Sequence, residues 1–89
     1  MTRVSIVTGG ASGIGRATVD ALLASGGSVV IIDRPSVELN ELAKLNRVLI
    51  VEGDVTDAEV NNAAVSLAHR EFGGLDAMIL NAGVPASGD

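Results

Sequence analysis

Cysteine, tryptophan and tyrosine are absent from this 89-residue sequence, and Phe72 is its single aromatic residue. Without cysteine, the chain can form neither a disulfide framework nor a thiolate zinc site. Cations are also scarce, because six Lys and Arg residues stand against eleven acidic ones and leave a formal net charge of −5. A protein that binds the phosphate backbone of nucleic acids needs a basic surface, so the composition argues against that class of partner.

Long apolar runs are missing as well. No run reaches the roughly 18 residues that a membrane-spanning helix needs. At the start of the sequence, Met1-Thr2-Arg3 leads directly into a strand-like segment instead of a signal peptide. These absences predict a soluble, cytoplasmic protein with no membrane partner.

The abundant residues are small and aliphatic. Hydrophobic residues, chiefly valine, alanine, leucine and isoleucine, make up 47% of the chain, and eleven glycines accompany them. Four short aliphatic runs are continuous or nearly so rather than alternating, which is typical of strands covered on both faces of a parallel sheet. These runs are residues 3–8, 29–32, 48–51 and 77–80.

Helical spacing of apolar residues fills the intervals between the runs. Residues 14–25 are predicted to form a helix that packs through Ile14, Ala17, Thr18, Ala21 and Leu22. Residues 37–45 predict a shorter helix with Ser36 as its N-cap.

The third helix is predicted from its capping signals. The segment Thr56-Asp57-Ala58-Glu59 fits a capping box, and Gly73-Gly74 ends the helix after Phe72. Its predicted packing face is Val60, Ala64, Leu67, Ala68 and Phe72. The order of elements is therefore βαβαβαβ in one partial domain over residues 1–89, with residues 84–89 as an unstructured tail.

A glycine-rich turn joins the first run to the first helix: Thr8-Gly9-Gly10-Ala11-Ser12-Gly13-Ile14-Gly15. Glycines allow backbone at positive φ and a close approach of a pyrophosphate, and the helix start offers unpaired N–H groups to an anion. Ser12 could donate to phosphate or cap the helix. A triphosphatase loop would continue with Lys and Ser or Thr, whereas this chain has Arg16 and Ala17. The alternative interpretation is that the glycines serve turn packing alone.

Asp33 ends the second aliphatic run, eighteen residues after Gly15. In dinucleotide-binding βαβ units, a carboxylate about 20 residues after the glycines accepts hydrogen bonds from the adenosine ribose. Its charge would oppose a 2′-phosphate and so favours NAD over NADP, although Arg34 could pair with that phosphate. An acid that only begins the loop before Pro35 is the alternative.

Polar and small residues also follow the third and fourth runs. Asp54 comes soon after the third run, and Asn81, Ala82 and Gly83 follow the fourth. The carboxyl ends of parallel strands meet at one edge of the sheet, where ligands of open α/β folds bind. An ordinary Asn-x-Gly turn explains the second segment equally well.

These four segments together resemble the coenzyme-binding half of a short-chain dehydrogenase/reductase. The resemblance implies a Rossmann-type parallel sheet with strand order 3-2-1-4 and a dinucleotide over the reversal between strands 1 and 4. It implies that Gly9, Gly13 and Gly15 form the phosphate turn, with Ser12 and Ile14 touching the coenzyme. It places the adenosine ribose at Asp33 beside Arg34, and the adenine at Asp54 and Val55. It places the nicotinamide-side ribose along Asn81, Ala82 and Gly83, with Asn81 mainly holding the sheet edge. NADP-preferring members commonly carry a basic residue inside the turn, where this chain has Ala11 and Ser12.

The catalytic part of the family pattern is missing from these residues. The family transfers a hydride between the nicotinamide and an alcohol or carbonyl substrate, using a Ser, a Tyr and a Lys that lie beyond the fourth strand. This chain has no Tyr, and its one lysine is Lys44, in the second predicted helix. His69 is expected at the surface, and no catalytic residue is assigned.

We therefore expect a coenzyme-binding portion that is truncated after the fourth strand and inactive alone. Its uncovered fourth strand predicts self-association or pairing with the missing C-terminal part. The alternative is a non-enzymatic nucleotide-binding or interaction module. A phosphoacceptor receiver domain is set aside, because it needs acidic residues where this chain has Thr8-Gly9-Gly10.

Overall fold

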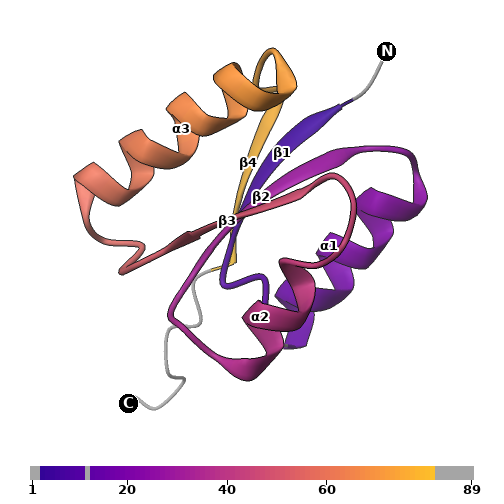
Figure 1. Cartoon of the computed structure of the whole chain (residues 1–89), viewed down its shortest axis with the longest axis horizontal. Helices are drawn as coiled ribbons and strands as arrows, with labels where there is room; N and C mark the ends of the chain where they lie inside the picture. The colour runs from indigo at the N-terminus through magenta and orange to yellow at the C-terminus, as the bar shows by residue number, and fades with distance from the viewer. Residues whose placement is uncertain (1–2, 12, 82–89) are drawn as a thin grey trace.

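Four parallel strands and three helices alternate along the chain (Figure 1). The computed structural model describes residues 3–11 and 13–81. Its elements are β1 (Val4–Thr8), α1 (Gly13–Ala24), β2 (Ser28–Asp33), α2 (Val37–Leu42), β3 (Val48–Glu52), α3 (Ala58–Phe72) and β4 (Ala77–Leu80). The strands form one sheet in the order β3-β2-β1-β4, which confirms the predicted topology. The predicted tail, residues 84–89, lies outside the described residues.

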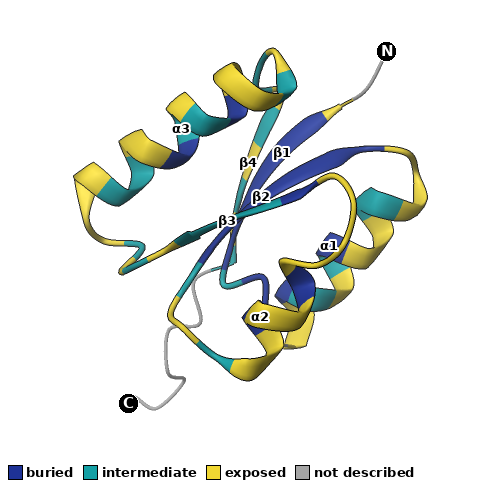
Figure 2. Ribbon diagram, viewed as in Figure 1, coloured by how far each residue is buried: buried dark blue, intermediate teal, exposed yellow. Residues whose placement is uncertain are grey.

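Helices cover both faces of the sheet: α1 and α2 pack on one face, and α3 packs on the other (Figure 1). Successive residues of a strand point to opposite faces, so the inner strands need apolar residues at nearly every position. Figure 2 shows β1 and β2 buried along their length, whereas β3 and β4 are more exposed. This two-sided burial explains why the aliphatic runs are continuous.

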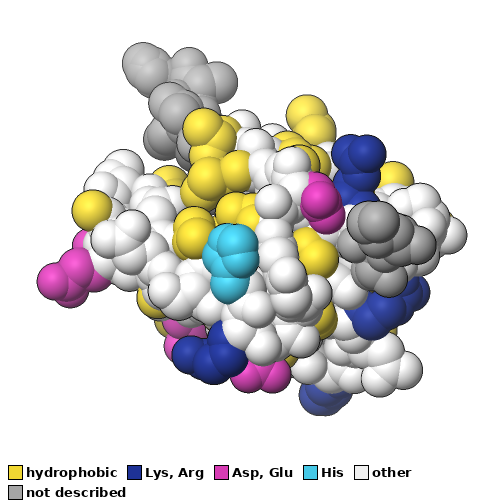
Figure 3. All heavy atoms as spheres, turned by 90° about the horizontal axis from the view of Figure 1, so that it is seen from above, with side chains coloured by type: hydrophobic (Ala, Val, Ile, Leu, Met, Phe, Trp, Pro, Cys, Tyr) yellow, Lys and Arg dark blue, Asp and Glu magenta, His cyan; other side chains and the backbone are white. Residues whose placement is uncertain are grey.

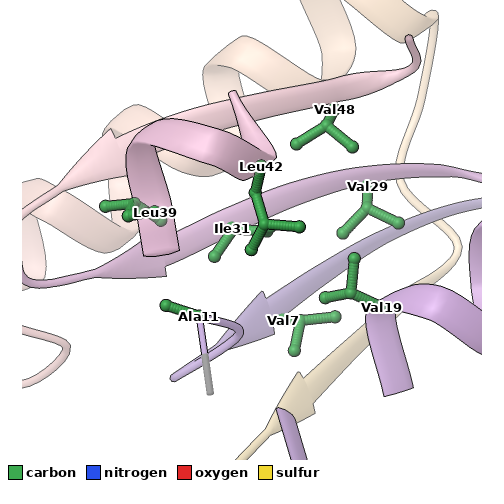
Figure 4. Close-up of a cluster of buried hydrophobic side chains, with 8 residues drawn as sticks. All are labelled: Val7, Ala11, Val19, Val29, Ile31, Leu39, Leu42 and Val48. Atoms are coloured by element: carbon green, nitrogen blue, oxygen red, sulfur yellow. The ribbon is translucent and has the colours of Figure 1, made fainter. Parts of the chain in front are cut away.

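Two apolar clusters result, one on each side of the sheet. The cluster under α1 and α2 (Figure 4) consists of Val7, Ala11, Val19, Val29, Ile31, Leu39, Leu42 and Val48. The cluster under α3 consists of Val4, Ile6, Val30, Ile32, Ala64 and Ala68. Ala11 belongs to the glycine turn rather than to a strand or helix, so the first cluster reaches the loop that the sequence marks as a binding site.

The predicted packing face of α1 is wrong. The helix buries Gly15 and Val19, whereas Ile14 is 78% exposed, and Ala17 and Ala21 are exposed too. Of the predicted face, Leu22 is partly buried against the first cluster. The reason is that the helix docks through Gly15, which has no side chain and so allows backbone to approach closely. Counting apolar side chains cannot detect such a contact.

The ends of α2 and α3 confirm the capping predictions in part. The Ser36 hydroxyl accepts a hydrogen bond from the Leu39 N–H at 3.0 Å, as an N-cap does, but α2 ends at Leu42 rather than at residue 45. The N-cap of α3 is Asp57, one residue later than the capping box predicts, because the Thr56 hydroxyl donates to Asp54 instead. The predicted packing face of α3 is confirmed, since Ala64 and Ala68 are buried with Val60, Leu67 and Phe72 packed around them.

Candidate functional site

The glycine turn follows β1 at the carboxyl edge of the sheet and leads into α1. Gly9 and Gly13 have φ values of 68° and 60°, in the left-handed region that glycine adopts most easily. The Gly9 N–H donates to the carbonyl of Ile32 on β2 at 2.8 Å. Gly10 lies against the first cluster, because a Cβ at this position would stand 2.8 Å from Cγ2 of Ile31. The turn therefore rests directly on the core.

Gly15 closes the turn against the helix. A Cβ at this position would overlap the Gly9 carbonyl oxygen and lie 2.5 Å from Nδ2 of Asn81, and a Cβ on Gly9 would overlap the Asn81 carbonyl. Packing inside the chain thus accounts for Gly9, Gly10 and Gly15. It does not account for Gly13, where no atom of the described residues lies within 4 Å of a Cβ. The positive φ of Gly13 is the reason that glycine suits this position, and the described residues leave the Cβ position of Gly13 open.

Asp33 lies at the end of β2 and contacts the glycine turn. Its Oδ2 accepts a hydrogen bond from the Ala11 N–H at 3.0 Å, and its Oδ1 accepts one from the Arg34 N–H at 2.8 Å. The side chain is half-buried, whereas Arg34 is exposed. The structure thus brings the predicted ribose-binding acid and the predicted phosphate turn together, through a contact that the sequence does not predict.

Asn81 connects the end of β4 to the same turn. Its backbone N–H donates to Thr8 Oγ1 at 2.9 Å, and its side-chain Nδ2 donates to the Gly9 carbonyl at 3.3 Å. Thr8 is buried, and sequence reasoning missed its role. A hydroxyl residue that ends an otherwise aliphatic strand is the signal that could have found it.

Asp54 serves the loop between β3 and α3. Its Oδ1 accepts hydrogen bonds from the backbone N–H and the hydroxyl of Thr56, at 2.8 and 2.7 Å. The pKa of the Asp54 carboxyl lies below its ordinary value, because the Thr56 backbone N–H and then its hydroxyl stabilise the ionised form, with a smaller contribution from the charge of Arg34. Val55 is half-buried against the second cluster. Asp54 is exposed, so its free oxygen atom faces solvent.

The remaining predicted site residues fall into two groups. Ile14, at the start of α1, is exposed and available for contact with a ligand. Ser12, Ala82 and Gly83 lie outside the described residues. His69 and Lys44 are exposed on α3 and next to α2, on opposite sides of the sheet from each other, and neither is hydrogen-bonded to the turn. Among the described residues, the candidate site therefore consists of turns at the carboxyl edge of the sheet.

A four-stranded parallel sheet with helices on both faces and a glycine turn beside a strand-ending acid defines a Rossmann-type α/β protein. Comparison with known proteins narrows this class. The profile of the short chain dehydrogenase family matches residues 3–89. The chain belongs to that family.

Individual relatives agree with this assignment. The chain is 46% identical over 82 residues to 3-hydroxyacyl-CoA dehydrogenase type-2 of Drosophila melanogaster, covering 90% of this chain and 32% of that protein. It is 41% identical over 83 residues to cis-1,2-dihydrobenzene-1,2-diol dehydrogenase of Pseudomonas putida, covering 91% and 30% respectively. It thus spans about a third of the length of these relatives.

Solved structures of similar fold lead to the same family. The crystal structure of the KRED1-Pglu enzyme superposes with a TM-score of 0.85 at 38% identity, over 93% of this chain and 36% of that one. L-Sorbose reductase from Gluconobacter frateurii, solved with NADPH and L-sorbose, gives a TM-score of 0.82 at 34% identity, over 92% and 34%. Members of this family bind a nicotinamide dinucleotide, either NAD or NADP, and the L-sorbose reductase structure contains NADPH.

Proposed function

We propose that this chain is the N-terminal, NAD-binding part of a short-chain dehydrogenase/reductase. The observation that carries the proposal is the glycine turn at the start of α1. Gly15 packs there against the Gly9 carbonyl, and the carboxylate of Asp33 accepts a hydrogen bond from the turn. The whole protein would transfer a hydride between the nicotinamide and an alcohol or carbonyl substrate. This chain alone would bind coenzyme without catalysing the reaction, because the catalytic Ser, Tyr and Lys of the family lie beyond the fourth strand.

Each part of the coenzyme has candidate partners at this edge of the sheet. The diphosphate would meet the amide groups at the start of α1, beside the open position of Gly13. The ribose hydroxyls of the adenosine would donate to Asp33, and the adenine would lie near Asp54 and Val55. The remaining partners, on the nicotinamide side, are Asn81, Ala82 and Gly83. When bound, the nicotinamide supplies the hydride acceptor or donor, and the chain's role is to hold and orient it.

The preference for NAD over NADP rests on charge. A 2′-phosphate on the adenosine ribose would stand beside the carboxylate of Asp33, and like charges in contact cost several kcal/mol. The guanidinium of Arg34 would oppose this effect, but it is exposed, where screening by water and salt weakens its attraction for the phosphate. The NADPH bound to L-sorbose reductase shows that relatives of this fold can make the other choice.

Calorimetric titration with NAD, NADP and ADP-ribose tests the proposal. We expect NAD to bind at least about tenfold more tightly than NADP, a difference of about 1.4 kcal/mol. Arg34→Ala should weaken NADP and leave NAD nearly unchanged, because only the 2′-phosphate would use that side chain. ADP-ribose that fails to bind at millimolar concentration would refute the coenzyme site, and tighter binding of NADP would refute the preference.

A non-enzymatic nucleotide-binding or interaction module is the second candidate function. A Tyr-x-x-x-Lys segment in the coding sequence after Asp89 would decide for the enzyme. In the described residues no helix is long and apolar enough to cross a membrane. A cytoplasmic location stays a prediction from composition.

The edge strand β4 is the candidate surface for a protein partner. Within the described part of the chain, β4 pairs with β1 alone, and its Met78 and Leu80 are 40% and 71% exposed. Their register partners on β1 include Ile6, so they share the face that α3 covers elsewhere. Figure 3, which views the molecule from above relative to Figure 1, shows hydrophobic side chains exposed among polar ones on that face. We propose that β4 pairs with a second copy or with the remaining part of the protein.

Sedimentation equilibrium over a range of concentrations tests this surface. The chain should associate more strongly at higher concentration, and Leu80→Lys should shift it toward the monomer, because a charge on an edge strand opposes pairing. The matched control is Val37→Lys, since Val37 is 72% exposed on α2, on the other side of the sheet. A wild-type chain that stays monomeric at tens of micromolar would contradict pairing with a second copy, and a control that dissociates the complex equally would show that β4 is not the surface used.

A further inference from the structure

The glycine turn is held by hydrogen bonds to residues of both neighbouring strands and of the positions that follow them. On the β2 side, Gly9 N–H donates to the Ile32 carbonyl, and Ala11 N–H donates to Asp33 Oδ2. On the β4 side, the Asn81 amide donates to the Gly9 carbonyl at 3.3 Å. Of these contacts, the bond between Ala11 and Asp33 is the one with a charged acceptor, and it joins residues 22 positions apart in the sequence.

Ala11 is fixed at two points, which makes this bond hard to replace with water. Its methyl group is buried in the first cluster, under α1 and α2 (Figure 4). Its N–H donates to a carboxylate that is itself half-buried. A backbone N–H that donates to an ionised acceptor forms a bond roughly twice as strong as a neutral one, and losing the acceptor leaves a shielded N–H unpaired.

The two oxygen atoms of Asp33 leave room for a second role. Each accepts one backbone N–H, from Ala11 or from Arg34, and an ionised carboxylate has about four acceptor sites. Ribose hydroxyls could therefore bind without releasing the turn. Ligand binding and support of the turn do not compete for the same lone pairs.

We propose that Asp33 is a positioning residue for the diphosphate turn: its carboxylate holds Ala11, and with it residues 9–11, in place in the ligand-free chain. This inference rests on the proposed function, because the turn is where the diphosphate would bind. It adds that the residue selecting the ribose also shapes the phosphate site. Substitutions of Asp33 should thus alter the turn even when no nucleotide is present.

Amide hydrogen exchange of the ligand-free chain, followed residue by residue by NMR, tests the proposal. In the wild type, Ala11 N–H should exchange about tenfold or more slowly than an open-chain amide, and Asp33→Ala should remove most of this protection. Asp33→Asn should restore part of it, because the amide oxygen can still accept from Ala11. The Ile31 amide, in β2, reports any change in global stability.

Asp57→Ala is the matched control, since Asp57 also accepts a backbone N–H, from Glu59, but at the start of α3. It should leave Ala11 protected relative to Ile31. If Asp33→Ala does not fold, the test rests on the protection of the Ala11 N–H in the wild type compared with that in Asp33→Asn. Ala11 exchanging at the open-chain rate in the wild type, or equal protection in wild type and Asp33→Ala, would overturn the inference. Because no nucleotide is used, a failed coenzyme titration would refute the proposed function without affecting this result.

Discussion

Alanine at position 15 is expected to lower the free energy of unfolding by about 2–3 kcal/mol and to abolish binding of ADP-ribose. The added Cβ would overlap the Gly9 carbonyl and crowd the Asn81 amide, and both neighbours are held by their own hydrogen bonds. Alanine also has a higher helix propensity than glycine, worth up to about 1 kcal/mol in a helix interior. The clash outweighs that gain, because the atom in the way is rigid backbone rather than the end of a flexible side chain.

Urea denaturation followed by far-ultraviolet circular dichroism measures this effect. Gly74→Ala is the matched control, because nothing lies within 4 Å of its Cβ and its φ is not positive. Gly74→Ala should change the free energy of unfolding by less than about 0.5 kcal/mol. A Gly15→Ala protein as stable as the wild type would mean that α1 does not dock through this position.

The second large effect concerns Gly10 and Ile31, which meet between the turn and the core. Ile31 is fully buried, so Ile31→Ala should cost about 2–5 kcal/mol. Gly10→Ala should cost about 1–3 kcal/mol, because its Cβ would stand 2.8 Å from Cγ2 of Ile31, a stiff β-branched side chain. Ile31→Ala removes the atoms that Gly10→Ala strikes. The double variant should therefore be more stable than the sum of the two losses predicts, by about 1 kcal/mol or more.

A double-mutant cycle in urea measures this coupling. The matched control replaces Ile31→Ala with Ile6→Ala, an isoleucine of the same burial that faces the cluster under α3. The cycle of Gly10 with Ile6 should be additive within about 0.5 kcal/mol. If the single variants lower the folded population too far, the same concentration of trimethylamine N-oxide in all samples restores it. Additivity in both cycles would show that Gly10 does not press on Ile31.

The strands were predictable from the sequence because two-sided burial leaves a direct mark, as in the run that became β2. Their order in space was not, and it came from the resemblance to a family. The face of α1 was mispredicted because its closest contact is made by Gly15, which contributes no hydrophobic side chain. The N-cap of α3 was misplaced by one residue because Thr56 uses its hydroxyl for Asp54.

The site was predictable as a set of segments but not as a set of contacts. Gly9 and Asn81 lie 72 positions apart, and only the pairing of β4 with β1 brings them together. The hydrogen bond from Ala11 to Asp33 has a backbone N–H as its donor. Every residue except proline has such a group, so the pattern of side chains in the sequence could not predict this bond. Asp33 was predicted as a site residue, whereas Ala11, the residue that donates a hydrogen bond to it, was not.

The strand order β3-β2-β1-β4 predicts that backbone hydrogen bonds at the carboxyl edge of the sheet open at different rates in its central and outer strands. The glycine turn follows β1 and Asp33 ends β2, and both of these strands have a partner strand on each side. Asp54 and Asn81 follow β3 and β4, which in the described chain have a partner on one side. Transient fraying begins at the margins of a sheet, where fewer hydrogen bonds must break. The adenine and nicotinamide ends of a bound dinucleotide would then contact loops that follow the edge strands, where local opening is frequent. Its diphosphate would contact the turn between the central strands, where local opening is rare.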